Sequence, residues 1–389
     1  MVPIPRKPGV LLSAALFFSV SFFSGAEAFL VEPQQYSLDM PMGWVPVEIL
    51  EDRATFAGPE DCAYLQVKAF PGDAFSDPAR ISSWASEKLK AAGDELPFVY
   101  SGYPAVFRDL IFSSGGFSFQ GYGVCIDGDD WDYFISSFTT EDLYNQLHPF
   151  MVSSLDSFAL GGEDRLLPGP VSQFYAGSYG EESLESGYID FEGRIIPFSY
   201  DRYALEASRV VIEREAQVLS AYTQSRSEEA WERYYRILYR DNHARLQGLH
   251  VALEGLPGLA GTGKRDAAET LLRWVQSFEF QRPGHLSDLY SPLETAVLRS
   301  GDCDSRGLLY TILLEKRGID AVLMVSTRYA HSMVAVDVEG PGARFPYGNK
   351  AYLVAETSDQ VDLGMIAADM ADPEGWIGLD LGSDAFLYE

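Results

Sequence analysis

A helix-period segment followed by three strand-period segments, all near the C-terminus, constrains the fold of this chain most. The stretch CDSRGLLYTILLEKRG predicts a helix that starts at Cys303 and stops at Gly318. Its apolar face carries Leu308, Leu309, Ile312 and Leu313. The stretches IDAVLMVST, HSMVAVDVEG and KAYLVAET then predict three strands. A helix packed on an antiparallel sheet follows from this order.

The last two of these strands bring a histidine close to a glutamate. If residues 331–338 and 350–357 form an antiparallel hairpin, the residue numbers of opposite partners have a constant sum. The numbers of His331 and Glu356 add to 687, which centres the hairpin inside the turn-forming stretch PGARFPYGN. We therefore expect the imidazole and the carboxylate to be neighbours, with the register open by a residue or two.

Cys303 stands at the start of the predicted helix, where free backbone N–H groups and the helix dipole favour a thiolate. His331 nearby would complete an ion pair, and Glu356 would orient its ring. The same N–H groups could hold a developing oxyanion. Asp302 and Asp304 flank the cysteine and would oppose the thiolate if they pointed at the sulfur. An oxidising compartment also threatens a reactive thiol.

These residues resemble the signature of the transglutaminase-like superfamily of papain-type cysteine enzymes. The signature is G-D-C at a helix start, then a histidine on a strand, then an acid on the next strand. Here it reads Gly301-Asp302-Cys303, His331 and Glu356, with spacings of 28 (331 − 303) and 25 (356 − 331). The resemblance covers about residues 265–360. The acid of the family is often aspartate, and Glu356 matches a bacterial subset.

The resemblance implies a Cys303–His331–Glu356 triad that hydrolyses or transfers an acyl group at an amide or peptide bond through a thioester. It also implies an oxyanion hole made of the Cys303 amide and an upstream side chain. Gln276 and Trp274 are the candidates for that side chain, and a structural role for either is an equal alternative. Because this superfamily includes inactive domains, a second function stays open: a catalytically inactive envelope protein that acts as a binding or scaffold module.

The first 28 residues predict a secretory signal peptide. Arg6 and Lys7 precede an apolar run, and Ala26 and Ala28 occupy the small positions of a cleavage site. The run is too short for a membrane span, and no later segment has the length and apolar character of one. We therefore expect an exported protein, periplasmic or extracellular.

Residues 29–160 predict an α+β domain. It resembles the PsbP/Mog1-like superfamily in an early P-x-G-W motif, here Pro41-Met42-Gly43-Trp44, and in Ser157-Phe158 on its last helix. In that superfamily the fold serves binding or docking more often than catalysis. Residues 161–187 are rich in Gly, Ser, Pro and Glu and predict a linker. Residues 188–389 would then form the transglutaminase-like domain with its preceding helices, so the expected fold class is α+β with two domains.

Charge and cysteine content limit the partners. The chain has 29 Lys and Arg against 57 Asp and Glu, a net charge of −28, which argues against nucleic acid as a partner. We expect a protein or peptide substrate, which the predicted export places in the cell envelope. Nothing in the sequence implies a metal or an organic cofactor. Cys62 and Cys125 could form a disulfide in an oxidising compartment, or both could stay reduced.

Overall fold

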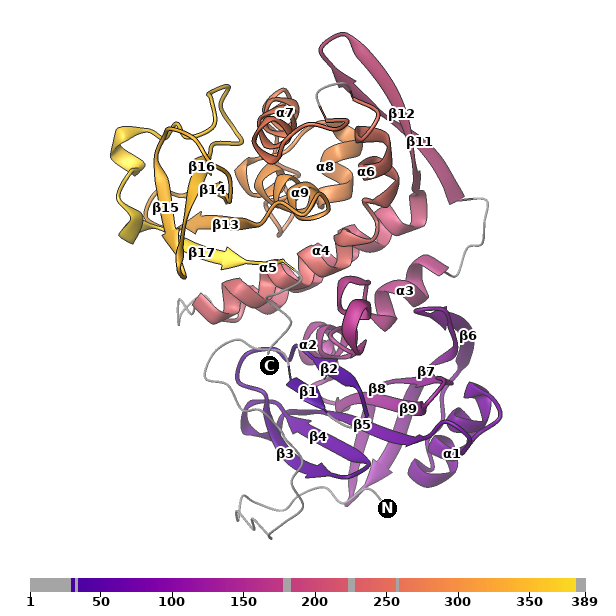
Figure 1. Ribbon diagram of the computed structural model, residues 1–389. Coiled ribbons are helices and arrows are strands. Elements are labelled where there is room, and N and C mark those ends of the chain that lie inside the picture. Colours follow the sequence, from indigo (N-terminus) through magenta and orange to yellow (C-terminus); the bar gives the residue numbers. More distant parts are fainter. Residues whose placement is uncertain (1–28, 32–33, 178–182, 223–227, 257–258, 383–389) are drawn as a thin grey trace. The chain divides into compact units, whose positions relative to one another are not determined.

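The computed structural model describes residues 29–31, 34–177, 183–222, 228–256 and 259–382. The predicted signal peptide, residues 1–28, lies outside them. The fold is α+β with antiparallel sheets, and the chain divides into two compact units (Figure 1). The first consists of Met1–Ser178 with Ser220–Tyr222, and the second of Tyr179–Leu219 with Thr223–Glu389.

The first unit is built on a seven-stranded antiparallel sheet with the strand order β3-β4-β5-β9-β8-β7-β6. A hydrophobic cluster on one face contains Ile81 of helix α1 together with Phe134. The cluster on the other face contains Leu155 of helix α2 together with Ile135, the next residue along β9. Because side chains alternate along a strand, one strand supplies both clusters and the sheet is covered on both faces. The bounds are β3 Val45–Leu50, β4 Arg53–Ala57, η1 Pro59–Asp61, β5 Ala63–Pro71, α1 Pro78–Leu89, β6 Glu95–Tyr100, β7 Tyr103–Ser114, β8 Phe117–Ile126, β9 Trp131–Thr140 and α2 Tyr144–Asp156.

Two connecting segments of this unit have a defined structure. The segment DGDD joins β8 to β9 as an antiparallel hairpin. The segment predicted as a linker contains more structure than its composition indicated: η2 spans Gly162–Leu166 and helix α3 spans Pro170–Gly177. The reason is aromatic packing, because Phe174 stacks on Phe107 with ring centroids 4.5 Å apart. A small sheet of β1 Phe29–Val31, β2 Tyr36–Leu38 and β10 Ala159–Leu160 completes the unit.

The second unit combines helices with a five-stranded antiparallel sheet of order β15-β16-β14-β13-β17 (Figure 1). A separate two-stranded ribbon, β11 with β12, precedes the helices. The helices are α4 Arg202–Ser220, α5 Glu228–His243, α6 Gln247–Leu253, α7 Lys264–Gln276, α8 Pro292–Leu298 and α9 Cys303–Glu315. The strands are β11 Leu184–Phe191, β12 Arg194–Asp201, β13 Ala321–Ser326, β14 His331–Val336, β15 Arg344–Tyr347, β16 Lys350–Ala355 and β17 Ile377–Asp380, with short 3-10 turns η4 Ala368–Met370 and η5 Pro373–Gly375.

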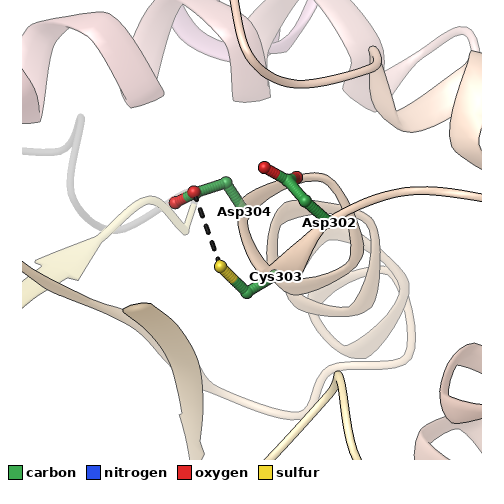
Figure 2. A group of neighbouring side chains, drawn as sticks. All are labelled: Asp302, Cys303 and Asp304. Atoms are coloured by element: carbon green, nitrogen blue, oxygen red, sulfur yellow. Dashed lines mark hydrogen bonds between the residues drawn. The ribbon is translucent and has the colours of Figure 1, made fainter. Parts of the chain in front are cut away.

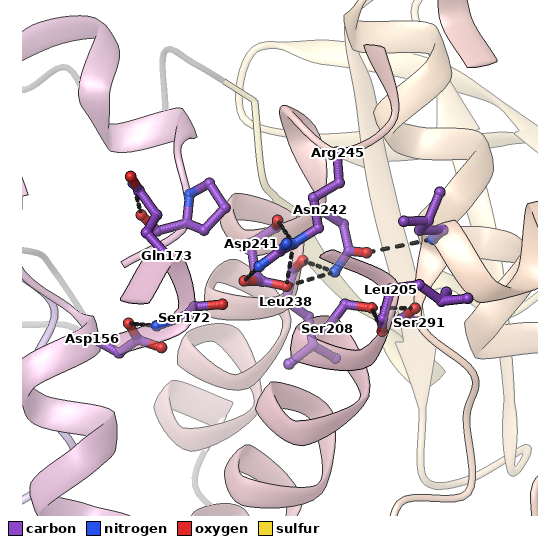
Figure 3. A network of polar contacts seen from close by, with 12 residues as sticks. Asp156, Ser172, Gln173, Leu205, Ser208, Leu238, Asp241, Asn242, Arg245 and Ser291 are labelled. Atoms are coloured by element: carbon purple, nitrogen blue, oxygen red, sulfur yellow. Dashed lines mark hydrogen bonds and ion pairs between the residues drawn. The ribbon is translucent and has the colours of Figure 1, made fainter. Parts of the chain in front are cut away.

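Polar contacts join the helices of this unit (Figure 3). The Ser208 hydroxyl of α4 donates to that of Ser291, the N-cap of α8, at 2.9 Å. Asn242 of α5 accepts from the backbone N–H of Leu293 at 3.4 Å. The Asn242 bond satisfies a donor of the first turn of α8 that no backbone carbonyl can reach, so α4 and α5 hold the start of that helix in place.

The strand register differs from the predicted one by two residues. Strand β14 pairs with β16 through Val334↔Ala355 and Val336↔Leu353, so the numbers of partners add to 689 rather than 687. The stretch predicted as a plain turn contains strand β15, which pairs with the outer edge of β16. A shift of two residues keeps every side chain on the same face of the sheet. The predicted meeting of the histidine and the glutamate therefore survives the change.

Candidate functional site

Cys303 is the first residue of α9, and the residue before it caps the helix. The Asp302 carboxylate accepts hydrogen bonds from the Ser305 backbone N–H at 3.0 Å and from the Ser305 hydroxyl at 2.7 Å. In the described part of the chain, the backbone N–H of Cys303 donates to no other group. The cysteine is 4% exposed, so the free N–H and the sulfur lie in a nearly closed site.

His331 and Glu356 form a direct pair. His331 opens β14, Glu356 directly follows β16, and the ring Nε2 lies 2.8 Å from the Glu356 Oε2. The other carboxylate oxygen accepts from the backbone N–H and the hydroxyl of Ser358, each at 2.7 Å. The Trp376 ring lies near the imidazole, with centroids 6.3 Å apart. These contacts fix the carboxylate and leave the imidazole one orientation.

The charges of this pair are coupled to the cysteine. Burial of the ring alone would lower the pKa of His331, but hydrogen bonds with the Cys303 sulfur and with Glu356 outweigh it and raise that pKa to about 10. Burial alone would raise the pKa of Glu356, but the hydrogen bond and charge of His331, with Ser358, lower it. The structure thus brings the three sequence-predicted residues together, with a charged imidazole at neutral pH.

A second carboxylate lies beside the sulfur. The Cys303 thiol donates to the Asp304 Oδ2 at 3.7 Å, whereas no hydrogen bond joins the Asp302 carboxylate to the sulfur (Figure 2). The hydroxyl of Tyr235, on α5, donates to the other Asp304 oxygen at 2.6 Å. The sequence had raised Asp304 as an opposing charge, but it gave no sign of Tyr235, which lies 69 residues away in sequence.

Asp302, Cys303 and Asp304 together present three side chains of the kinds that bind metal ions. The sulfur and the carboxylate oxygens of Asp302 and Asp304 lie within 4.8 Å of one another. A closed zinc site needs four ligands, and here one oxygen of each carboxylate already accepts a hydrogen bond, from Ser305 for Asp302 and from Tyr235 for Asp304. The arrangement fits a thiol held by hydrogen bonds better than it fits a metal ion.

The two candidates for oxyanion support lie elsewhere in the packing. The Gln276 amide nitrogen donates to the backbone carbonyls of Glu356 at 2.8 Å and of Val361 at 2.9 Å. Both of its hydrogens are therefore used, and Gln276 anchors the strand end that carries the acid. Trp274 is fully buried and packs edge-on against Phe278, and its indole N–H has no hydrogen-bond partner among the described residues. Structural roles account for what both side chains do in this structure.

Arg306 is a further residue of the site that we did not predict. Its guanidinium is 1% exposed and donates to the carbonyls of Gly301 at 2.9 Å, Phe278 at 2.8 Å and Thr357 at 3.4 Å. It therefore ties the turn before Cys303 to the residue after Glu356. The clue in the sequence is that Arg306 occupies the predicted apolar face of the helix, where an unpaired charge would be costly.

The thiols of Cys62 and Cys125 are both free in the structure. Cys125 belongs to the hydrophobic cluster under α1, whereas Cys62 packs against the cluster on the other face of the sheet. Because the sheet separates the two side chains, the structure does not pair them, and the bridge that we considered does not form.

Comparisons with known proteins find similarity to solved structures but no match to a protein family or to a curated protein. Similar solved structures include a PsbP (CyanoP) from the cyanobacterium Synechocystis, with a TM-score of 0.30 and 12% identity over 38% of this chain and 98% of that one. LpqN of Mycobacterium tuberculosis, described as involved in cell envelope biogenesis, gives a TM-score of 0.27 and 13% identity over 34% of this chain and 87% of that one. A protein of Bacteroides thetaiotaomicron gives a TM-score of 0.27 and 11% identity over 58% of this chain and 81% of that one. These TM-scores are too low to assign either unit to a family.

The search for membrane spans gives a simple result. None of the helices in the described part of the chain combines the length and the apolar character that a membrane crossing needs.

Proposed function

We propose that the second unit is a transglutaminase-like domain that performs thiol acyl transfer at an amide or peptide bond. The observation that carries the proposal is the His331–Glu356 pair at 2.8 Å, beside a Cys303 thiol that helps to raise the pKa of the same imidazole. A cysteine at a helix start, a histidine and an orienting acid are the parts that nucleophilic catalysis by a thiol requires.

The proposed reaction begins when the Cys303 thiol has given its proton to water, which leaves a thiolate beside the His331 imidazolium. The sulfur attacks the carbonyl carbon, and the oxyanion that forms accepts a hydrogen bond from the backbone N–H of Cys303. His331 gives its proton to the leaving amine, the C–N bond breaks and a thioester remains. Neutral His331 then takes a proton from water, which attacks the thioester and releases the acid. Glu356 holds the ring in one orientation throughout.

Hydrolysis of a peptide or amide is the reaction we favour over crosslinking, because the acid Glu356 matches a bacterial subset of the superfamily. The substrate would be a protein or peptide in the cell envelope, reached by export of the chain. The first unit would be a PsbP/Mog1-like domain that docks a partner. No metal or organic cofactor takes part in this scheme.

One observation favours the alternative function, a catalytically inactive binding or scaffold module. Cys303 is only 4% exposed, whereas attack on a carbonyl needs an open path to the sulfur. In this alternative the three residues would be a buried polar network that keeps α9 on the sheet.

A general acyl donor distinguishes the two functions. The protein is mixed with p-nitrophenyl acetate, and nitrophenolate release and the mass of the Cys303 peptide are followed over time. The acyl-transfer function predicts an acetylated Cys303 peptide, a burst of one equivalent and continued turnover, all absent in Cys303→Ala. In His331→Ala the turnover should fall at least tenfold. An absence of Cys303 acetylation under conditions that acetylate surface lysines would support the binding module.

A further inference from the structure

The contact between Cys303 and Asp304 has a feature that the acyl-transfer scheme does not use. The scheme needs the sulfur to pair with His331, yet in the structure the thiol also donates to the Asp304 carboxylate at 3.7 Å (Figure 2). Asp304 is therefore a competing partner for the thiol proton. The sulfur lies between a cation on β14 and an anion on its own helix.

Tyr235 holds that anion in place. Its hydroxyl lies 2.6 Å from the Asp304 Oδ1, a distance typical of a hydrogen bond from O–H to a charged carboxylate. Tyr235 is 2% exposed, and its ring stacks on Trp231 with centroids 5.9 Å apart. Burial, with the charge of Asp304, raises the pKa of Tyr235 well above its usual value, so the hydroxyl stays a donor. Asp304 is thus a fixed carboxylate rather than a free surface acid.

We propose that Asp304, anchored by Tyr235, is a positioning residue that keeps Cys303 in a protonated, hydrogen-bonded resting form. This inference rests on the proposed function, because it names what restrains the nucleophile of that reaction. Forming the thiolate breaks the S–H···Oδ2 bond and releases one proton to water, since a charged His331 cannot accept it. The resulting thiolate is attracted by His331 and repelled by Asp304. The charged and titratable groups that face the sulfur from the packed elements are Asp302 at the N-cap of α9, Asp304 and Arg306 on α9, Tyr235 on α5, His331 on β14 and Glu356 after β16.

The test is the rate of Cys303 alkylation by iodoacetamide between pH 5 and 9 in Asp304→Asn. An asparagine keeps the shape of the side chain and an oxygen for the Tyr235 hydroxyl, but it removes the charge. We expect labelling at pH 6 to become about tenfold faster, with the whole profile displaced to lower pH. An unchanged or slower rate at pH 6, in a variant with native circular dichroism, would overturn the proposal.

The matched control is Asp302→Asn, which removes a carboxylate from the same turn. Asparagine is as good an N-cap as aspartate, so the helix start is kept. The Asp302 carboxylate lies within 4.8 Å of the sulfur but is hydrogen-bonded to Ser305 rather than to the thiol, and burial with the charge of Asp304 raises its pKa to about 6, so it is only partly charged at pH 6. We expect Asp302→Asn to change the rate of Cys303 alkylation at pH 6 by less than about twofold. An effect as large as that of Asp304→Asn would mean that any nearby charge acts on the thiol, and would contradict a specific role.

Failure of this inference can be told apart from failure of the proposed function. The proposed function is read from acetylation and turnover of Cys303, and from their dependence on His331. The role of Asp304 is read from the ratio of the alkylation rate of Asp304→Asn to that of the wild type across the pH range. If the protein turns over its substrate but this ratio stays at one, only the proposed role of Asp304 fails. If the profile of Asp304→Asn is displaced but no turnover occurs, Asp304 restrains a thiol that is not catalytic, and only the proposed function fails.

Discussion

Two buried cysteines, one in each unit, have opposite surroundings. Cys125 is fully buried in the apolar cluster under α1, where burial raises the pKa of its thiol to about 12 although Arg108 opposes the shift. Cys303 is almost as buried, but His331 and Asp304 are its hydrogen-bonding neighbours. Burial is thus shared by the two thiols, and what differs is which charged groups lie near the sulfur: Arg108 and Glu95 for Cys125, and His331 and Asp304 for Cys303. Chemistry at a cysteine depends on those groups more than on its exposed fraction.

The largest expected effect is the difference in reactivity between these two thiols. In the native protein at pH 7 we expect Cys303 to react with iodoacetamide at least about a hundredfold faster than Cys125. Peptide-resolved mass spectrometry measures both rates in one sample, with the denatured protein as the reference for equal labelling. Comparable native rates would show that burial alone controls both.

Two buried arginines offer the next comparison. Arg306→Met should cost about 3 kcal/mol in the free energy of unfolding, because it leaves several buried carbonyls without a donor, and it should also slow Cys303 labelling. Arg108 in the first unit is likewise buried and donates to the carbonyl of Ser82 at 2.9 Å. Arg108→Met should cost a similar amount but leave Cys303 labelling unchanged. Urea unfolding measures the stability of both variants, and alkylation measures the reactivity of Cys303 in each. An equal slowing of Cys303 labelling in both variants would contradict a specific role of Arg306 at the site.

The stability of the second unit should depend on pH through the His331–Glu356 pair, which the first unit lacks. The folded pKa of His331, about 10, is raised above its ordinary value of 6.5. Its stabilisation is therefore fully present below pH 6.5 and is lost as pH rises through 10. The pKa of Glu356 is lowered, so its contribution is lost in acid, as pH falls below 4.5. Urea unfolding gives the free energy of unfolding of the wild type and of Glu356→Gln, and the difference between the two should shrink between pH 6.5 and 10. A constant difference would argue against the ion pair.

The smallest effect concerns the support of the acid. Ser358→Ala removes one hydroxyl hydrogen bond to Glu356 and should cost about 1 kcal/mol in the free energy of unfolding. It should also lower the pKa of His331 slightly, as measured by NMR titration of the ring. An unchanged histidine titration would show that Ser358 has no influence on the pair.

The sequence predicted those parts of the site that depend on local pattern. Helix α9 begins at Cys303 and strand β14 begins at His331, as the periodicity indicated. The strand register differs by two residues from the centred one, within the residue or two that the prediction left open, and β15 forms within the stretch predicted as a turn. The site survives this difference because a shift of two preserves the face of each side chain.

Contacts between distant segments could not be predicted in the same way. Gln276 contacts the Glu356 carbonyl across 80 residues, and Tyr235 reaches Asp304 across 69. No periodicity encodes such pairs, because they depend on how helices pack after each has formed. Arg306 is the exception, since a charge on an apolar helix face indicates a buried partner even where the partner itself cannot be named.

The measurement we would make first is the alkylation of Cys303 by iodoacetamide at pH 6, in the wild type and in His331→Ala. Peptide-resolved mass spectrometry reads Cys125 in the same samples as the internal control. We predict rapid labelling of Cys303 in the wild type and a loss of at least about tenfold in the variant, with Cys125 unaffected. Slow labelling that follows an ordinary thiol titration and is the same in both proteins would contradict a thiolate–imidazolium pair and make Cys303 a structural residue.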